Sequence, residues 1–331
     1  MVPLLAAGLG LALGVGSRRR KPFSFRGKAV VITGGSRGLG LVMARAFAAE
    51  GARLALCGRD GATLERARAE LAAAGAVVHV AVCDVRVPEQ VQAFIAEAQS
   101  RLGPIDVLVN NAGIIQAGPI ESMTTADFED ALATHFWGPL HAMLAVYPDM
   151  KARGHGRIVN IASFGGRVSV PHLIPYSASK FALVGLSDGM RAELAAHGIH
   201  VTTVAPGLMR TGSPRNATFK GSAAAEYSWF TLGDSLPGFS VNAERAARLI
   251  LEACRRGDGE LVIGLPARVG VVARAIAPHL TQGALALANR LMPSGASRVA
   301  RRGRDVESPL TRSWLTVLTQ RAAARNNEVG V

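Results

Sequence analysis

Short apolar runs alternate with longer, alanine-rich amphipathic segments along residues 29 to 263 of this chain. The runs rich in Val, Ile and Leu predict β-strands, and the segments between them predict helices. This alternation is typical of a parallel sheet covered by helices on both faces, so we predict an α/β fold with a doubly wound sheet. About seven strands are expected, at residues 29–33, 53–57, 77–82, 106–109, 157–161, 200–204 and 260–263, with a helix over about 175–197.

Length and composition fit one large domain with a further segment on either side. The chain has 331 residues, of which 49% are hydrophobic and 18% charged, which is ample for a sizeable core. We expect an apolar N-terminal membrane anchor with a basic run at 1–22, the sheet domain at 23–263, and a basic, partly apolar helical extension at 264–331. Three scattered cysteines lack metal-ligand spacing, so a metal-free site and a reduced, cytoplasm-facing compartment are expected.

A glycine-rich turn follows the first predicted strand. Residues 29–40 read A-V-V-I-T-G-G-S-R-G-L-G and lead into the helical segment L-V-M-A-R-A-F-A-A-E. Gly34, Gly38 and Gly40 carry no Cβ, so backbone amides at the positive end of that helix can approach a pyrophosphate. A tight turn that only packs strand against helix would use the same residues. The strand before the turn and the helix after it favour a dinucleotide site.

Tyr176 and Lys180 stand four residues apart in the run Y-S-A-S-K, and Ser163 precedes the tyrosine. Positions i and i+4 share one face of a helix, so we expect the lysine ammonium beside the phenol, where it favours the ionised form. A free tyrosine titrates at about 10, and a nearby cation in a dehydrated site can bring its pKa towards neutrality. For an isolated match, a surface tyrosine packed on a lysine stem is the alternative.

Two further motifs complete the pattern. N-N-A-G at Asn110 to Gly113 follows an apolar strand, and P-G-L-M-R-T at Pro206 to Thr211 follows the strand V-T-T-V. In this order and combination, the four features resemble the short-chain dehydrogenase/reductase family over residues 28 to about 263. The resemblance implies a Rossmann-type fold that binds a nicotinamide dinucleotide and interconverts a carbonyl and an alcohol.

The resemblance assigns a role to each motif. Tyr176 would be the general acid that protonates a carbonyl oxygen, or the base in the reverse direction, and Ser163 would hold that oxygen. Lys180 would lower the pKa of the tyrosine and bond the nicotinamide ribose. Thr211 would bind the nicotinamide carboxamide, and Asp84 the adenine amino group. The implied cofactor-binding residues are Thr33, Gly34, Ser36, Arg37, Gly38, Leu39, Gly40, Arg59, Asp84, Val85, Asn110, Ala112, Gly113, Tyr176, Lys180, Pro206, Gly207 and Thr211, with Asn110, Ala112 and Gly113 on the adenosine ribose side.

One position departs from the family pattern. The family places a fourth catalytic residue, an asparagine, three residues before a helix glycine, and here T-H-F-W-G places His135 there. In the family this asparagine helps a water connect the lysine to solvent. His135 can also bond a water, so it is a candidate catalytic residue. The alternative is a partly buried helix histidine with no part in catalysis.

Cofactor choice is predicted from the end of the second strand, R-L-A-L-C-G-R-D. An acid at such a strand end bonds the ribose 2′-hydroxyl of NAD, whereas an arginine accommodates the 2′-phosphate of NADP. Gly58 occupies the acid's place, Arg59 follows it, and Arg37 offers a second guanidinium from the glycine turn. This arrangement favours NADP, unless both arginines are ordinary surface charges. Asp60 is one residue late for the NAD role and could cap the next helix instead.

Basic residues are concentrated at the two ends of the chain. Residues 1–28 carry +6 and residues 261–304 carry +7 with no acid in either, which together account for the formal net charge of +13. Both segments are apolar between their basic residues and poor in aromatics, so a membrane surface fits them better than nucleic acid.

The first sixteen residues are uncharged and precede S-R-R-R-K, which predicts a membrane-associated protein whose catalytic domain faces the cytoplasm. Sixteen residues are short for a full span, so a tilted or partly inserted anchor is as consistent as a crossing, and a disordered start is the alternative.

The C-terminal extension resembles no family that we can assign. Its apolar stretch with spaced arginines is typical of an interfacial helix, and a helical pair that caps the substrate cleft or forms an oligomer contact is the alternative. Pro278 should break this stretch in two. The last twelve residues, Q-R-A-A-A-R-N-N-E-V-G-V, are expected to form a frayed tail.

Substrate class is inferred from the segment after the P-G motif, which forms a lid over the substrate in the family. Five aromatic residues lie in residues 208–240, namely Phe219, Tyr227, Trp229, Phe230 and Phe239. Such a lid suits an apolar, lipid-like substrate, although it could also bury its aromatics on the core.

We therefore predict an NADP(H)-dependent oxidoreductase, and a homo-oligomer, that reduces a lipid-like carbonyl at a membrane surface. The alternatives are an NAD-dependent alcohol dehydrogenase and a non-catalytic nucleotide-binding scaffold.

Overall fold

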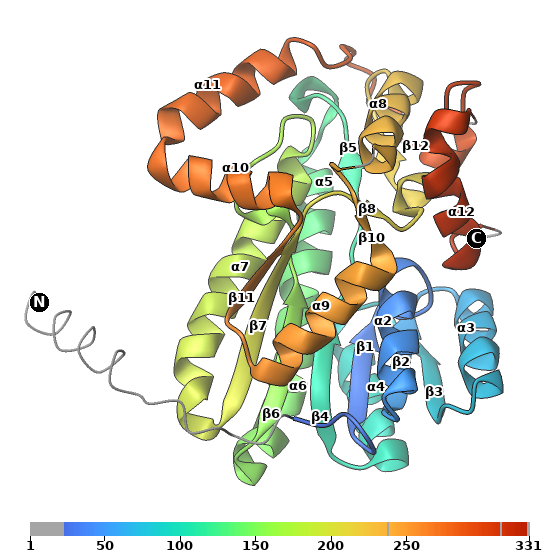
Figure 1. The fold of residues 1–331 in the computed structure, drawn as a ribbon, viewed down its shortest axis with the longest axis vertical. Helices are drawn as coiled ribbons and strands as arrows, with labels where there is room; N and C mark the ends of the chain where they lie inside the picture. Colours follow the sequence, from blue (N-terminus) through green and yellow to red (C-terminus); the bar gives the residue numbers. More distant parts are fainter. Residues whose placement is uncertain (1–22, 237, 312, 330–331) are drawn as a thin grey trace, which may run out of the picture.

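The computed structural model of the protein describes residues 23–236, 238–311 and 313–329. Seven parallel strands form its main sheet in the order β11-β7-β6-β4-β1-β2-β3, as predicted (Figure 1). Each predicted strand lies within two residues of an observed one. The strands are β1 Ala29–Thr33, β2 Arg53–Gly58, β3 Val78–Val82, β4 Ile105–Asn110, β6 Gly156–Ile161, β7 Ile199–Pro206 and β11 Glu260–Ile263.

Helices cover both faces of the sheet. The larger ones are α2 Gly38–Ala49, α3 Gly61–Ala73, α4 Pro88–Leu102, α5 Thr125–Leu132, α6 Gly138–Arg153, α7 Ile174–Leu194 and α9 Ala243–Arg256. A π-helical turn, Ala133–Trp137, joins α5 to α6. Asp60 caps α3 by accepting a 2.7 Å hydrogen bond from the Thr63 amide, which confirms the prediction for this residue.

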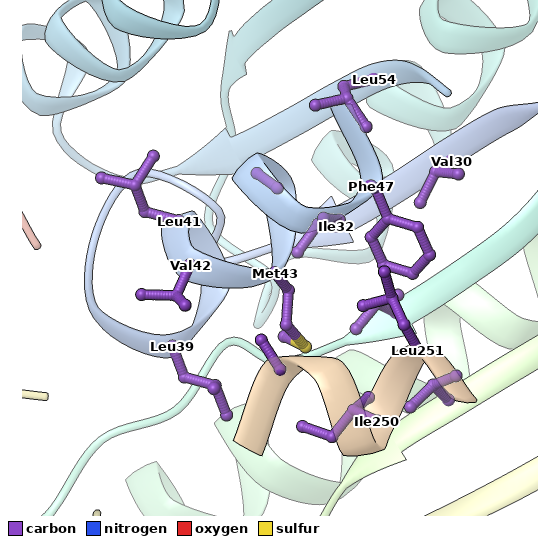
Figure 2. Packing of buried hydrophobic residues seen from close by; sticks show 14 of the residues in the cluster. Val30, Ile32, Leu39, Leu41, Val42, Met43, Phe47, Leu54, Ile250 and Leu251 are labelled. Carbon is purple, nitrogen blue, oxygen red and sulfur yellow. The ribbon is translucent and has the colours of Figure 1, made fainter. Parts of the chain in front are cut away.

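The core consists mainly of two apolar clusters, one on each face of the sheet, because alternate residues of each buried strand point to opposite sides. Val30 and Ile32 of β1 pack towards α2 and α9, whereas Ala29 and Val31 pack towards α4 and α6. Figure 2 shows the first cluster, in which Phe47 of α2 lies close to residues of α9. This packing fixes the start of α2, and therefore the glycine turn, over the carboxyl end of β1.

Smaller elements lie above the carboxyl ends of the strands. β5 Gln116–Ala117, β9 Thr218–Phe219 and β12 Arg301–Arg302 form one small sheet, and β8 Met209–Arg210 pairs with β10 Val241–Asn242. Helix α8, Ala223–Ser235, belongs to the predicted lid.

The C-terminal extension contains three helices, α10 Leu265–Ile276, α11 Pro278–Asn289 and α12 Val317–Arg325. Pro278 begins α11 and separates it from α10, as predicted. Helix α12 lies beside α8 (Figure 1), with Ser235 and Thr319 joined by a 2.7 Å hydrogen bond.

The prediction of a frayed tail is wrong for residues 320–329. They form the end of α12 and a segment in which Asn326 and Glu328 are buried. The sequence pattern did not indicate this ordered segment, because polar side chains rather than an apolar pattern hold it in place.

Candidate active site

A cavity of about 530 Å³ opens at the carboxyl ends of the strands, on both sides of β1 and β4. The connections run in opposite directions along the sheet from these two strands, and such a switch point is where open α/β sheets bind ligands. Of the eighteen predicted cofactor-binding residues, fifteen line the cavity; Thr33, Gly40 and Asn110 do not.

Those three residues support the lining instead of contributing to it. Thr33 Oγ1 accepts hydrogen bonds from the amides of Asn111 and Ala112, at 3.0 and 3.1 Å. Asn110 donates a 2.8 Å hydrogen bond to the Asn160 side chain within the sheet, so the prediction that it lines the ribose side is wrong. Its neighbour Asn111, which sequence reasoning did not select, lies in the lining and bonds the Gly34 carbonyl at 2.9 Å.

The glycine turn lies in the wall of the cavity. Gly34 has a φ of +64°, and a Cβ there would meet the Ala112 backbone at 2.8 Å. Gly38 begins α2 with a φ of +56°, so the positive end of the α2 dipole points at the cavity. Only glycine satisfies both the conformation and the contact at Gly34. The turn therefore matches the shape and the polarity that a diphosphate requires.

Tyr176, Lys180 and Ser163 meet in this cavity, as predicted. Ser163 ends the segment after β6, while the tyrosine and the lysine lie in the first turns of α7, which begins with Pro175. Tyr176 forms a side-chain hydrogen bond with Ser163, and this bond lowers its pKa. Burial has the larger effect and holds the pKa of Tyr176 above its usual value.

Lys180 does not lower the pKa of the tyrosine in the way that the spacing predicted. Its Nζ donates a 2.8 Å hydrogen bond to the Ile161 carbonyl and lies 5.7 Å from the centroid of the Tyr176 ring. Burial lowers the pKa of the Lys180 ammonium to about 7. The expectation of an ionised tyrosine at neutral pH is therefore wrong for this state of the site, because burial favours the neutral form of both groups.

His135 is fully buried in the π-helical turn and uses both ring nitrogens. Nε2 accepts a 3.1 Å hydrogen bond from the Ile114 amide, so the proton is on Nδ1, which bonds Ser179 Oγ at 2.7 Å. Ser179 in turn donates to the Tyr176 carbonyl at 2.8 Å. Burial holds the pKa of His135 well below its usual value.

These bonds leave no ring nitrogen of His135 for a water relay, so the predicted catalytic role is not supported. His135 instead connects Ile114, a residue of the cavity wall, to the backbone of the helix that carries Tyr176. It is a positioning residue. The sequence could not show this because the two partners come from separate segments.

The end of the cavity beside β2 and β3 is charged. Gly58, Arg59 and Asp84 line it, with Arg59 exposed. Arg86 holds Asp84 through bonds as short as 2.6 Å and lowers the pKa of this carboxyl. Arg37 lies 3.6 Å from the carboxylate of Glu328, which sequence reasoning did not place in the site.

The lid only partly follows its prediction. Phe219, Tyr227 and Phe230 pack together in a small cluster, and none of them lines the cavity. Trp229 and Phe239 are exposed. The apolar residues that line the cavity come from other segments and include Ile114, Ile115 and Met209.

A doubly wound parallel sheet with a bare glycine turn and a Ser-Tyr-Lys set at its switch point defines a dinucleotide-dependent oxidoreductase. The family model of the short chain dehydrogenases matches residues 28–220. Together with the relatives described next, this match shows that the chain belongs to the short-chain dehydrogenase/reductase family.

Two relatives illustrate the range of the family. A Danio rerio protein named "Dehydrogenase/reductase SDR family member 7B" is 34% identical over 287 residues, which cover 84% of this chain and 91% of the relative. The granaticin polyketide synthase putative ketoacyl reductase 1 of Streptomyces violaceoruber is 41% identical over 183 residues, or 55% of this chain and 67% of the relative.

Solved structures agree with the fold. A short-chain dehydrogenase from Streptomyces avermitilis has a TM-score of 0.67 and 31% identity, covering 80% of this chain and 98% of that chain. A gluconate 5-dehydrogenase from Burkholderia cenocepacia, in complex with NADP and tartrate, has a TM-score of 0.65 and 30% identity, covering 74% and 98%.

Proposed function

We propose that this protein is an NADP(H)-dependent reductase that converts an apolar ketone or aldehyde to an alcohol. The observation that carries the reaction is the meeting of Tyr176, Ser163 and Lys180 in the cavity over the glycine turn. The cavity suits a dinucleotide, because its volume of about 530 Å³ is continuous from Arg59 to Thr211 and the glycine turn lies in its wall.

In the reductive direction, Tyr176 is the proposed proton donor. A phenol whose pKa is held above its usual value keeps its proton at neutral pH, so it can donate that proton to a carbonyl oxygen. The Ser163 hydroxyl, bonded to Tyr176, would hold the same oxygen. The cofactor, when bound, supplies the hydride, and the residues of this chain orient the carbonyl and deliver the proton.

NADP is proposed over NAD because Gly58 leaves no carboxylate at the end of β2, where Arg59 is exposed at the cavity rim. An exposed guanidinium at this place can bond a 2′-phosphate through two N–H groups. The NADP in the Burkholderia cenocepacia structure is consistent with this choice.

The apolar substrate is supported by Ile114, Ile115 and Met209, which line the same cavity as the catalytic residues. The test is NADPH oxidation with a panel of long-chain, steroidal and short polar carbonyl compounds. We expect turnover of the apolar members. Turnover confined to the short polar ones would contradict the substrate class, and turnover with NADH alone would contradict the cofactor.

We also propose that the protein acts at an anionic membrane surface. Helices α10 and α11 follow β11 and lie at the outer edge of the fold (Figure 1), where they expose Leu265, Ile276 and Leu280 by 74%, 79% and 78%. Arginines are spaced between these apolar residues, in a segment without acids. No helix among the described residues is long and apolar enough to cross a membrane. The predicted anchor at 1–22 lies outside the described residues.

Sedimentation with liposomes tests this location. Wild type should sediment with phosphatidylserine vesicles more than with neutral ones. A variant with Leu265, Ile276 and Leu280 changed to Ser should lose part of the sedimented fraction. Equal sedimentation of both proteins with both kinds of vesicle would contradict a role for α10 and α11.

A further inference from the structure

The C-terminal tail, defined here as Asn326 to Glu328, lies on the glycine turn at the rim of the cavity. Asn327 Nδ2 donates hydrogen bonds to the carbonyls of Ser36 and Thr63, at 2.9 and 3.0 Å. Asn327 has a φ of +59°, a left-handed conformation that asparagine tolerates. These two bonds hold the tail against the loop after β1 and against the first turn of α3.

Asn326 joins the tail to α2 and to the segment that follows β7. Its carbonyl accepts a 2.9 Å hydrogen bond from the Gly38 amide at the start of α2. Its side chain accepts a 3.1 Å hydrogen bond from Arg45 of α2 and donates one of 3.4 Å to the carbonyl of Thr211, beyond β7. The tail thus crosses the mouth of the cavity.

Glu328 places a carboxylate inside this site. Its side chain is only 4% exposed and lines the cavity. Asn216 donates a 2.6 Å hydrogen bond to one carboxylate oxygen, and Arg37 Nε lies 3.6 Å from the same oxygen. The other oxygen lies against the bare Cα of Gly38, where a Cβ would meet it at 2.6 Å.

The glycine turn at the start of α2 is where this fold can bind a phosphate. Anions bind at helix N-termini because backbone amides and the helix dipole converge there. In this structure the Gly38 amide already bonds Asn326, and the carboxylate of Glu328 occupies the space in front of the turn. A diphosphate and a carboxylate cannot share that space without strong like-charge repulsion.

We propose that the C-terminal tail competes with the dinucleotide for this site, with Glu328 standing in for the cofactor phosphates at Gly38 and Arg37. Glu328 then determines how tightly the protein binds its cofactor. The inference rests on the proposed function, because the ligand that displaces the tail is the nicotinamide dinucleotide.

Displacement of the tail would break polar contacts rather than an apolar core. Its contacts with the site are hydrogen bonds and one ion pair, and Val329 after it is half exposed. Segments at chain ends that bury little apolar surface open at low cost. Displacement also releases Arg37, which then becomes available to the 2′-phosphate.

Direct binding of NADPH and NADH to Glu328→Gln tests the proposal. Glutamine keeps the shape and the bond to Asn216 but removes the charge, so NADPH should bind about tenfold more tightly than to wild type. The gain for NADH should be smaller, because NADH has no 2′-phosphate for the released Arg37. Unchanged or weaker NADPH binding would overturn the proposal.

Glu244→Gln is the matched control. Glu244 pairs with Arg325 at 3.0 Å, so this variant removes the same charge near the end of α12 without touching the cavity lining. Its affinity for NADPH should equal that of wild type. A tenfold gain in this control as well would show that general charge, and not the position of Glu328, sets the affinity, which also overturns the proposal.

Hydrogen exchange gives a readout that does not depend on activity. In wild type the Glu328 amide bonds the Ala323 carbonyl at 3.0 Å, so peptides covering 317–331 should exchange faster once NADPH is bound. Slower exchange would mean that the tail closes over the cofactor, contrary to the competition proposed. Cofactor binding without carbonyl reduction would refute the proposed function alone, and absence of binding in every variant would refute both.

Discussion

Lys180 donates a 2.8 Å hydrogen bond to the carbonyl oxygen of Ile161, at the end of β6, while its Nζ lies 5.7 Å from the centroid of the Tyr176 ring. The ammonium therefore bonds the backbone of the sheet and also lies within cation–π range of the Tyr176 ring. Burial is the largest influence on the pKa of each group. Both groups are favoured in their neutral forms when no cofactor charge is present.

The first prediction concerns the ionisation of Tyr176. Because its pKa is held above the usual value, Tyr176 in the cofactor-free protein should be less ionised than a free tyrosine at every pH. The difference in ultraviolet absorbance between wild type and Tyr176→Phe, followed from pH 6 to 11, measures it. A tyrosinate signal that appears at pH 8 in wild type alone would contradict the structure.

The second prediction separates positioning from proton transfer at His135. His135→Ala leaves the Ile114 amide without its acceptor and removes one of the two partners of Ser179, so we expect about 1–3 kcal/mol of lost stability and reduced turnover. The pH dependence of turnover should keep its shape, since His135 is neutral in wild type across the neutral range. A shifted pH profile with unchanged stability would instead indicate a relay.

The third prediction concerns Asp234, which is buried on α8. Burial raises the pKa of this carboxyl to about 8 from an ordinary value of 3.8. The folded state therefore binds its proton more tightly than the unfolded chain, and the stability due to this proton is lost as pH rises from about 4 to 8. Asp234→Asn should match wild type near pH 4 and exceed it by a few kcal/mol, an order-of-magnitude figure, above pH 8.

Thermal or urea unfolding of both proteins across this pH range measures the difference. A constant difference at all pH values would show that Asp234 does not titrate in the folded state. Asp188→Asn, a change on an exposed carboxyl of α7, serves as the control.

The fourth prediction concerns cofactor choice. Arg37 is paired with Glu328, whereas Arg59 is exposed at the cavity rim, so Arg59→Ala should cost more NADPH affinity than Arg37→Ala in the otherwise wild-type protein. We expect about tenfold or more for Arg59→Ala and little change for NADH, because only the 2′-phosphate contact is lost. Arg101→Ala, on the outer face of α4, is the control. Equal losses for both cofactors would contradict a 2′-phosphate role.

The sequence predicts the sheet well because apolar runs such as 29–33 and 260–263 are long enough to be buried and are bounded by turn residues. It also predicts which residues meet at the cavity, since the motifs follow the carboxyl ends of parallel strands. The electrostatics of Tyr176 and Lys180 could not be predicted, because the i, i+4 spacing does not show that the Ile161 carbonyl accepts the bond from the ammonium.

Two features depend on contacts between segments that are remote in sequence. His135 bonds partners in the loop after β4 and in α7. From the sequence alone, this histidine shows only a departure from the family pattern. Asn326, Asn327 and Glu328 carry no apolar periodicity, so their docking on the glycine turn has no signal in the local pattern. Burial of polar residues by specific hydrogen bonds is visible only in three dimensions.

The central claim is that Tyr176 donates the proton in carbonyl reduction, and NADPH oxidation by wild type and Tyr176→Phe tests it most directly. Phenylalanine keeps the ring but has no exchangeable proton, so turnover of an apolar carbonyl substrate should fall by at least about 100-fold. NADPH binding, measured separately, should be largely kept. Turnover at the wild-type rate in Tyr176→Phe would contradict the account.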